Sequence, residues 1–118
     1  MTGETKLGRI EISPAAVATL ASQAVLGCYG VVGLSSPSLR HGLAEVLRRD
    51  NTRRGVEVRL VDHEIVIDLY VVIEYGTRVS EVAHNVMQNV KFNVEKALGV
   101  PVAQVNVHVQ GLRVSSQD

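Results

Sequence analysis

The sequence predicts a two-layer α+β fold, in which helices cover one face of a small mixed or antiparallel sheet. Two observations support this prediction. Valine-rich stretches alternate apolar and polar residues with a period of two, and the stretches between them place apolar residues at three- and four-residue steps. These patterns follow one another in the order β-α-α-β-β-α-β. The 118 residues suit a single domain, 1–118, and we expect short flexible tails at 1–6 and 115–118.

The first half of the chain predicts one strand and two helices. The stretch GRIEIS at 8–13 alternates and predicts a short strand. A serine followed by a proline opens the helix at 14–26, and Gly27 is well placed to end it. The same serine–proline signal opens a second, shorter helix at 36–49. The glycine-rich segment between them is then a turn that leads from one helix to the next.

The second half predicts a hairpin, a long helix and a last strand. The hairpin at 55–76 has two alternating strands and a polar turn at 62–64. A continuous apolar stripe predicts the helix at 79–98, and a glycine and a proline follow its end. The segment 104–114 alternates again, with valines expected to face the core.

The predicted helices cover only one face of the sheet, and the other face needs a separate explanation. The second hairpin strand carries apolar residues on both sides, so that face is too apolar to be a comfortable solvent surface. Either it binds a partner, or the segment 27–36 or 112–118 covers it. The residues expected there are Arg59, Val66, Tyr70, Val72, Asn106 and His108. Phe92 is a lone aromatic on a polar helix face, and it is either an interface anchor or packs on a neighbouring loop.

The net charge of the chain is zero, because its twelve basic and twelve acidic residues cancel. This argues against a protein whose whole surface binds nucleic acid or anionic lipid. A local patch for an anionic partner stays open, although a run of arginines is also typical of a solvated helix face. No aromatic residues interleave with this run, which weakens an interpretation based on base stacking. The arginines concerned are Arg40, Arg48, Arg49, Arg53 and Arg54.

The smaller motifs predict architecture more than chemistry. Gly27-Cys28-Tyr29-Gly30 matches the GXXG loop of KH domains, but its inner residues carry no positive charge, and a helix end followed by a tight glycine path explains it as well. Cys28 cannot form an internal disulfide and has apolar neighbours, so we expect a buried structural thiol and a reducing compartment.

No metal, cofactor or catalytic site is predicted. Glu81 and His84 have the spacing of half a carboxylate-bridged metal site, but no second copy exists on another helix. The HExxH, GxSxG and P-loop patterns do not occur. No apolar run approaches the roughly 20 residues that span a bilayer. Any membrane contact is therefore expected to be peripheral or through a partner.

Four stretches together resemble the alkaline shock protein family of Gram-positive bacteria. They are GRIEISPAAVATLASQAV, CYGVVGLSS, VVIEYGTRVSEVAHNVMQNVKFNVE and VNVHVQGLRV. The insert HGLAEVLRRDNTRRGVEV resembles the short branch of that family, whose members have about the length of this chain. The resemblance covers Leu7 to Val114.

This resemblance implies a small cytoplasmic protein linked to cell-envelope stress and alkaline tolerance. Some members gather at the inner face of the membrane through a separate membrane-anchored partner and self-assemble. The resemblance implies no enzymatic activity, cofactor or catalytic residue. We therefore expect a self-associating scaffold or adaptor near the membrane, whose partners are copies of itself and a membrane-anchored protein. The alternative is a nucleic-acid-binding module that uses the basic stretch from Arg40 to Arg54.

Overall fold

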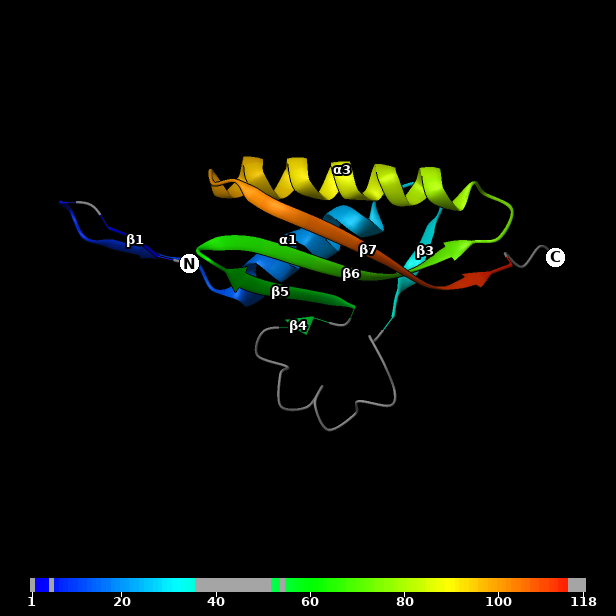
Figure 1. The fold of residues 1–118 in the computed structure, drawn as a ribbon, viewed down its shortest axis with the longest axis horizontal. Helices are drawn as coiled ribbons and strands as arrows, with labels where there is room; N and C mark the ends of the chain where they lie inside the picture. Colours follow the sequence, from blue (N-terminus) through cyan, green and yellow to red (C-terminus); the bar gives the residue numbers. More distant parts are fainter. Residues whose placement is uncertain (1, 5, 36–51, 54, 115–118) are drawn as a thin grey trace, which may run out of the picture.

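The predicted α+β class is confirmed by the computed structural model of the chain. Helices α1 (Pro14–Leu26) and α3 (Val79–Leu98) lie together on one face of a mixed sheet, as Figure 1 shows. The second predicted helix, at 36–49, lies outside the described residues. The structure describes residues 2–4, 6–35, 52–53 and 55–114.

Strand β6 (Glu64–Glu74) is the centre of the sheet. On one side, β5 (Val56–Val61) pairs with its first half and β3 (Val31–Leu34) with its second half, both antiparallel. Tyr70 marks the junction, because its N–H donates to Gly55 and its carbonyl accepts from Ser35. On the other side, β7 (Val102–Arg113) runs parallel to β6 along nearly its whole length. The short strand β4 (Thr52–Arg53) extends the sheet beyond β5.

The predicted hairpin is confirmed, with a two-residue turn between β5 and β6. Asp62 and His63 both have positive φ, at 52° and 68°. This is the backbone that matches the twist of two antiparallel strands. The long helix and the serine N-cap are also as predicted: Ser13 Oγ accepts from the Ala16 N–H at 3.1 Å. Gly99 ends α3 with φ 77°.

Segment 31–34 differs from the sequence-based prediction. It was expected to be part of a turn between helices, and it is strand β3, paired with Ile73 to Val71 of β6. Gly27 does end α1, but in a right-handed conformation. Gly30, with φ +87°, turns the chain into β3 beside α3, where a Cβ would lie 2.8 Å from Val82 Cγ2. The glycine segment is therefore a joint between a helix and an edge strand.

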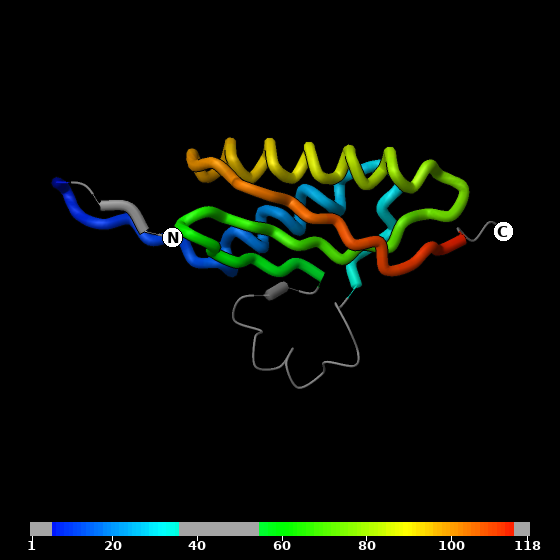
Figure 2. The backbone as a smooth tube through the Cα atoms, viewed as in Figure 1, coloured from blue at the N-terminus to red at the C-terminus, as the bar shows by residue number. Residues whose placement is uncertain are grey.

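The N-terminal strand also differs from the expected arrangement. Strand β2 (Arg9–Glu11) pairs with β1 (Thr2–Glu4) in a separate two-stranded sheet, and part of the expected tail at 1–6 is therefore strand. This ribbon extends away from the main sheet at the left of Figure 1, and the blue tube in Figure 2 leads from β2 to α1. Further along, Ile12 packs against the core.

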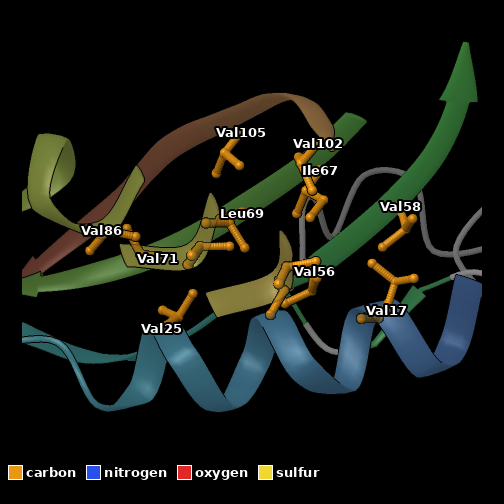
Figure 3. Close-up of a cluster of buried hydrophobic side chains, with 14 of the residues drawn as sticks. Val17, Val25, Val56, Val58, Ile67, Leu69, Val71, Val86, Val102 and Val105 are labelled. Carbon is orange, nitrogen blue, oxygen red and sulfur yellow. The ribbon is translucent and has the colours of Figure 1, made fainter. Parts of the chain in front are cut away.

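The core lies between the sheet and the two helices. Every second residue of β6, from Ile65 to Ile73, is almost fully buried and faces the helices. Helix α1 brings Val17 and Val25 against them, as Figure 3 shows, and α3 contributes a valine at nearly every turn. The core contains no aromatic side chain among the described residues, so β-branched and other aliphatic groups fill it. Neither of these two helices covers the opposite face of the sheet.

Candidate interaction surface

The outer face is the side of the sheet opposite α1 and α3. The strand register brings together most of the residues predicted for it. Asn106 of β7 lies beside Asp68 of β6, and His108 lies beside Tyr70. On the other side of β6, Arg59 lies opposite Val66. The outer face is defined here by Arg59, Val66, Asp68, Tyr70, Val72, Asn106 and His108.

Asp68 is the centre of a polar cluster on this face. Its Oδ2 accepts from Arg59 Nε at 3.1 Å and Nη2 at 2.9 Å. Its Oδ1 lies 3.1 Å from both Asn106 Nδ2 and His108 Nε2. Only 6% of Asp68 is exposed, so three side chains from the two neighbouring strands surround a buried carboxylate. Buried charges are found in proteins when they are paired and hydrogen-bonded in this way.

The surroundings of Asp68 favour its charged form. Burial alone would raise its pKa, but hydrogen bonds from His108, Arg59 and Asn106, together with the charge of Arg59, outweigh burial. The net effect lowers the pKa of Asp68 below its ordinary value of 3.8. The cluster therefore holds a permanent anion at neutral pH.

Tyr70 and His108 form the aromatic part of the outer face. Their rings are stacked, with centroids 4.6 Å apart and planes at 12°. Because His108 Nε2 also faces Asp68, the stack fixes the imidazole from its flat side while the carboxylate fixes it from its edge. A ring held in two directions loses little conformational freedom when another surface contacts it.

The apolar part of the outer face is smaller than the sequence indicated. Val66 is only 6% exposed, and its register neighbours are Arg59 and Gln104, whose long side chains belong to the same face. Tyr70 and Val72 are partly exposed. The outer face therefore consists of a polar cluster and a small apolar area beside it, formed by Tyr70 and Val72.

Sequence reasoning missed Asp68. It is the one acidic residue inside the apolar stretch IVIDLYVVI, and a charge at the centre of such a strand requires partners. That signal was available from the sequence. The identity of the partners was not, because Asn106 and His108 lie about forty residues further along the chain and reach Asp68 only through parallel pairing.

The structure separates the remaining predicted residues from the outer face. Phe92 lies on α3, in the helical layer, 62% exposed and with Lys96 Nζ 5.8 Å from its ring centroid. Arg53 lies in β4, where it pairs with Val56. Four arginines of the predicted anionic-partner patch lie outside the described residues: Arg40, Arg48, Arg49 and Arg54.

Two further candidates have structural partners. Glu81 accepts from Arg78 in an exposed ion pair at 3.3 Å. The thiol of Cys28 donates to the carbonyl of Ala24 at 3.3 Å and accepts from Asn89 Nδ2 at 3.2 Å. Among the described residues, no group of three or more His, Cys, Asp or Glu side chains is placed to hold a metal ion. Within the same part of the chain, no helix is both long and apolar enough to cross a membrane.

Residues 2–114 match the alkaline shock protein 23 family, whose description is a cell envelope-related function. The chain belongs to this family. The uncharacterised protein YloU of Bacillus subtilis strain 168 is 46% identical over 113 residues, which cover 95% of this chain and 94% of YloU. The uncharacterised protein Spy1614 of Streptococcus pyogenes serotype M6 is 38% identical over 115 residues, 97% of this chain and 95% of that protein. The family expected from the sequence is thereby confirmed.

Among solved structures, the fold is similar to that of the MamM CTD. Its copper form has a TM-score of 0.52 at 15% identity, covering 88% of this chain and 91% of that one. A methionine-to-leucine variant of the same CTD has a TM-score of 0.51 at 18% identity, covering 82% and 95%. At such identities the likeness concerns the fold alone.

Proposed function

We propose that the protein is a self-associating scaffold or adaptor without enzymatic activity, working in the cytoplasm at or near the inner face of the membrane. Its outer face binds copies of itself, and a membrane-anchored partner protein brings the assembly to the envelope. Membership of a family with a cell envelope-related function supports this setting. Nucleic acid has no part in the proposal.

The observation that carries the proposal is the composition of the outer face. Neither α1 nor α3 covers it, and Tyr70 and Val72 lie beside a cluster whose polar groups are bonded to one another. Such a face offers apolar area for burial and a rigid polar rim. Binding to a surface that is already ordered costs little entropy.

The chemistry of Asp68 supports a binding role more than a catalytic one. Both of its oxygens already accept hydrogen bonds from Arg59, Asn106 and His108. These donors stabilise the carboxylate and lower its pKa, whereas a general base works best with a pKa near the working pH. The cluster is therefore built to hold a charge in place.

The test is the size of the protein in solution. Sedimentation velocity over a range of concentrations should show the wild type as an oligomer and Tyr70→Asp and Val72→Asp as smaller species, because each places a charge on the apolar part of the outer face. Gln88→Asp, on the exposed side of α3, is the matched control and should leave the oligomer unchanged. Folded variants that keep the wild-type size would overturn the proposal.

A further inference from the structure

Strand β7 presents a long edge. It pairs with β6 along one side, and no strand among the described residues pairs with its other side. In Figure 1 it runs along the margin of the sheet, beneath α3. An edge of this kind exposes a row of backbone N–H and C=O groups that can pair with another strand.

The edge lacks the usual protection against such pairing. Natural proteins place lysine, proline or inward charges on exposed edges, or interrupt them with bulges. From Ala103 to Leu112, β7 has no charged residue and no proline. Its two irregularities lie towards its ends, one between Val102 and Gln104 and the other between Val109 and Gly111. The stretch 104–109 between them is regular and ready to pair.

The beginning of β7 is already engaged by α3. Lys91 Nζ donates to the carbonyl of Val102 at 2.8 Å, and the Val102 N–H donates to Glu95 Oε2 at 2.8 Å. These two bonds fix the strand against the helix at one end. The part of the edge that can take a partner is therefore the regular stretch.

We propose that this edge pairs with the same edge of a second copy, antiparallel, about a two-fold axis at Val107. Two sheets would then join into one continuous sheet, with the helices of both copies on the same side. The inference rests on the proposed self-association and specifies a contact for it that is separate from the outer face.

The sequence of β7 is complementary to itself in this register. On the helix side, Val105 lies opposite Val109 of the second copy, and Val107 lies opposite its own counterpart. Val109 is 39% exposed in the single chain and would be covered. A shift of one residue would place these valines opposite polar side chains, and among the registers that keep the alternation, this one pairs all three valines with one another.

The outer side of the same register is equally compatible. Asn106 lies opposite His108, and Gln104 lies opposite Gln110, the residue at the second irregularity of β7. Amide and imidazole side chains form hydrogen bonds with one another, and no Asp, Glu, Lys or Arg side chains meet in this register. Residues 103–112 of β7 contain no Asp, Glu, Lys or Arg that would attract a strand of opposite charge. A second copy of the same uncharged strand is therefore the partner that this edge fits best. The two Asp68 clusters would then lie on one continuous outer face.

Cysteine cross-linking tests the pairing and its register. In a Cys28→Ser background, Val107→Cys should form a covalent dimer with a short bifunctional thiol reagent. Gln104→Cys and Gln110→Cys should cross-link when mixed, and neither should do so alone. A Val107→Cys chain that stays uncross-linked, or a Gln104→Cys chain that cross-links with itself, would overturn the proposal.

A second variant separates this edge from the outer face. Val109→Lys places on β7 a lysine of the kind that prevents pairing at exposed sheet edges. It should abolish the Val107→Cys cross-link, whereas Gln88→Lys on α3 should leave the cross-link unchanged. If the cross-link persists in a Tyr70→Asp background, the edge contact stands without the outer face. If Tyr70→Asp dissociates the wild-type oligomer but Val107→Cys never cross-links, the outer face stands and the edge contact is wrong.

Discussion

The guanidinium of Arg59 on β5 binds a single carboxylate oxygen of Asp68 on β6 through two nitrogens, Nε at 3.1 Å and Nη2 at 2.9 Å. Because both donors use Oδ2, the other oxygen is left for Asn106 and His108 of β7. The carboxylate thus connects three strands of the sheet across its outer face. Connections of this kind stabilise a fold only while every partner is present.

Replacing Asp68 by alanine should therefore destabilise the protein. The substitution removes the shared acceptor and leaves the side chains of Asn106 and His108 without it, at an expected cost of about 1–3 kcal/mol in the free energy of unfolding. Urea unfolding followed by circular dichroism measures this loss. Glu81→Ala, which breaks the exposed pair with Arg78, is the control and should cost less than about 1 kcal/mol. Equal effects would show that the cluster does not hold the sheet.

Acid should weaken the fold through the same carboxylate. The folded pKa of Asp68 lies below its ordinary value of 3.8, so the unfolded chain binds the proton more readily. The stabilisation is complete above 3.8 and is lost as the pH falls through the lower, folded value. Urea midpoints measured from neutral pH to below 3.8 should fall more steeply for the wild type than for Asp68→Asn. Parallel curves for the two proteins would contradict this assignment.

Glu95 gives an internal comparison for the acid response. Hydrogen bonds from Lys91 and from the Val102 N–H lower its pKa from an ordinary value of 4.5. Its stabilisation is therefore also lost on acidification, but from a higher starting pH. Glu95→Gln should flatten the stability curve below 4.5 while leaving the part due to Asp68 in place. The difference between the two variants assigns each part of the curve to its residue.

Gly30 should tolerate no side chain, although Gly33, three residues further along, should. Gly30 has φ +87°, and a Cβ there would lie 2.8 Å from Val82 Cγ2. Gly30→Ala is expected to lower the free energy of unfolding by about 1–3 kcal/mol through backbone strain alone. The close contact between the new Cβ and Val82 should increase this loss. Gly33 has neither a positive φ nor a neighbour within 4 Å, so Gly33→Ala should change stability by no more than about 0.5 kcal/mol. Thermal unfolding of both variants makes the comparison.

A double variant separates the two causes at Gly30. Val82→Ala removes the methyl groups that a Cβ would meet, and leaves the strained φ unchanged. Combined with Gly30→Ala, it should therefore cost less than the sum of the two single substitutions. Additive costs would mean that the contact with α3 is unimportant.

Long periodic segments allowed much of this fold to be predicted from the sequence. The valine stripe of α3 and the alternation of β5 and β6 each extend over several repeats, so the pattern outweighs any single residue. Strand β3 has four residues and includes Gly33, which is too short for a period to be visible. It becomes a strand because Val31 and Leu34 pair with the second half of β6, which β5 does not reach. Tertiary pairing, rather than local sequence, therefore determines this strand.

The outer face was predictable in membership but not in character. Alternation placed Arg59, Tyr70 and His108 on one side of the sheet, as found. It could not show that Asp68 gathers Arg59 and His108 around itself, because that depends on which strands are neighbours and in what register. Parallel pairing of β6 with β7 is decided by the way α3 returns the chain, and no local pattern records it.

Asn89 should anchor the end of α1 to α3. Its Nδ2 lies 3.2 Å from both the Ala24 carbonyl and Cys28 Sγ, in the last turn of α1 and just beyond it. Helix ends leave carbonyls without partners in the helix, so loss of this donor should loosen the turn. Asn89→Ala is expected to cost about 0.5–1.5 kcal/mol and to speed amide hydrogen exchange between Ala24 and Cys28. Asn85→Ala, one turn earlier on an exposed part of α3, should do neither. Unchanged exchange at the end of α1 in Asn89→Ala would mean that the Asn89 side chain does not hold this end of the helix.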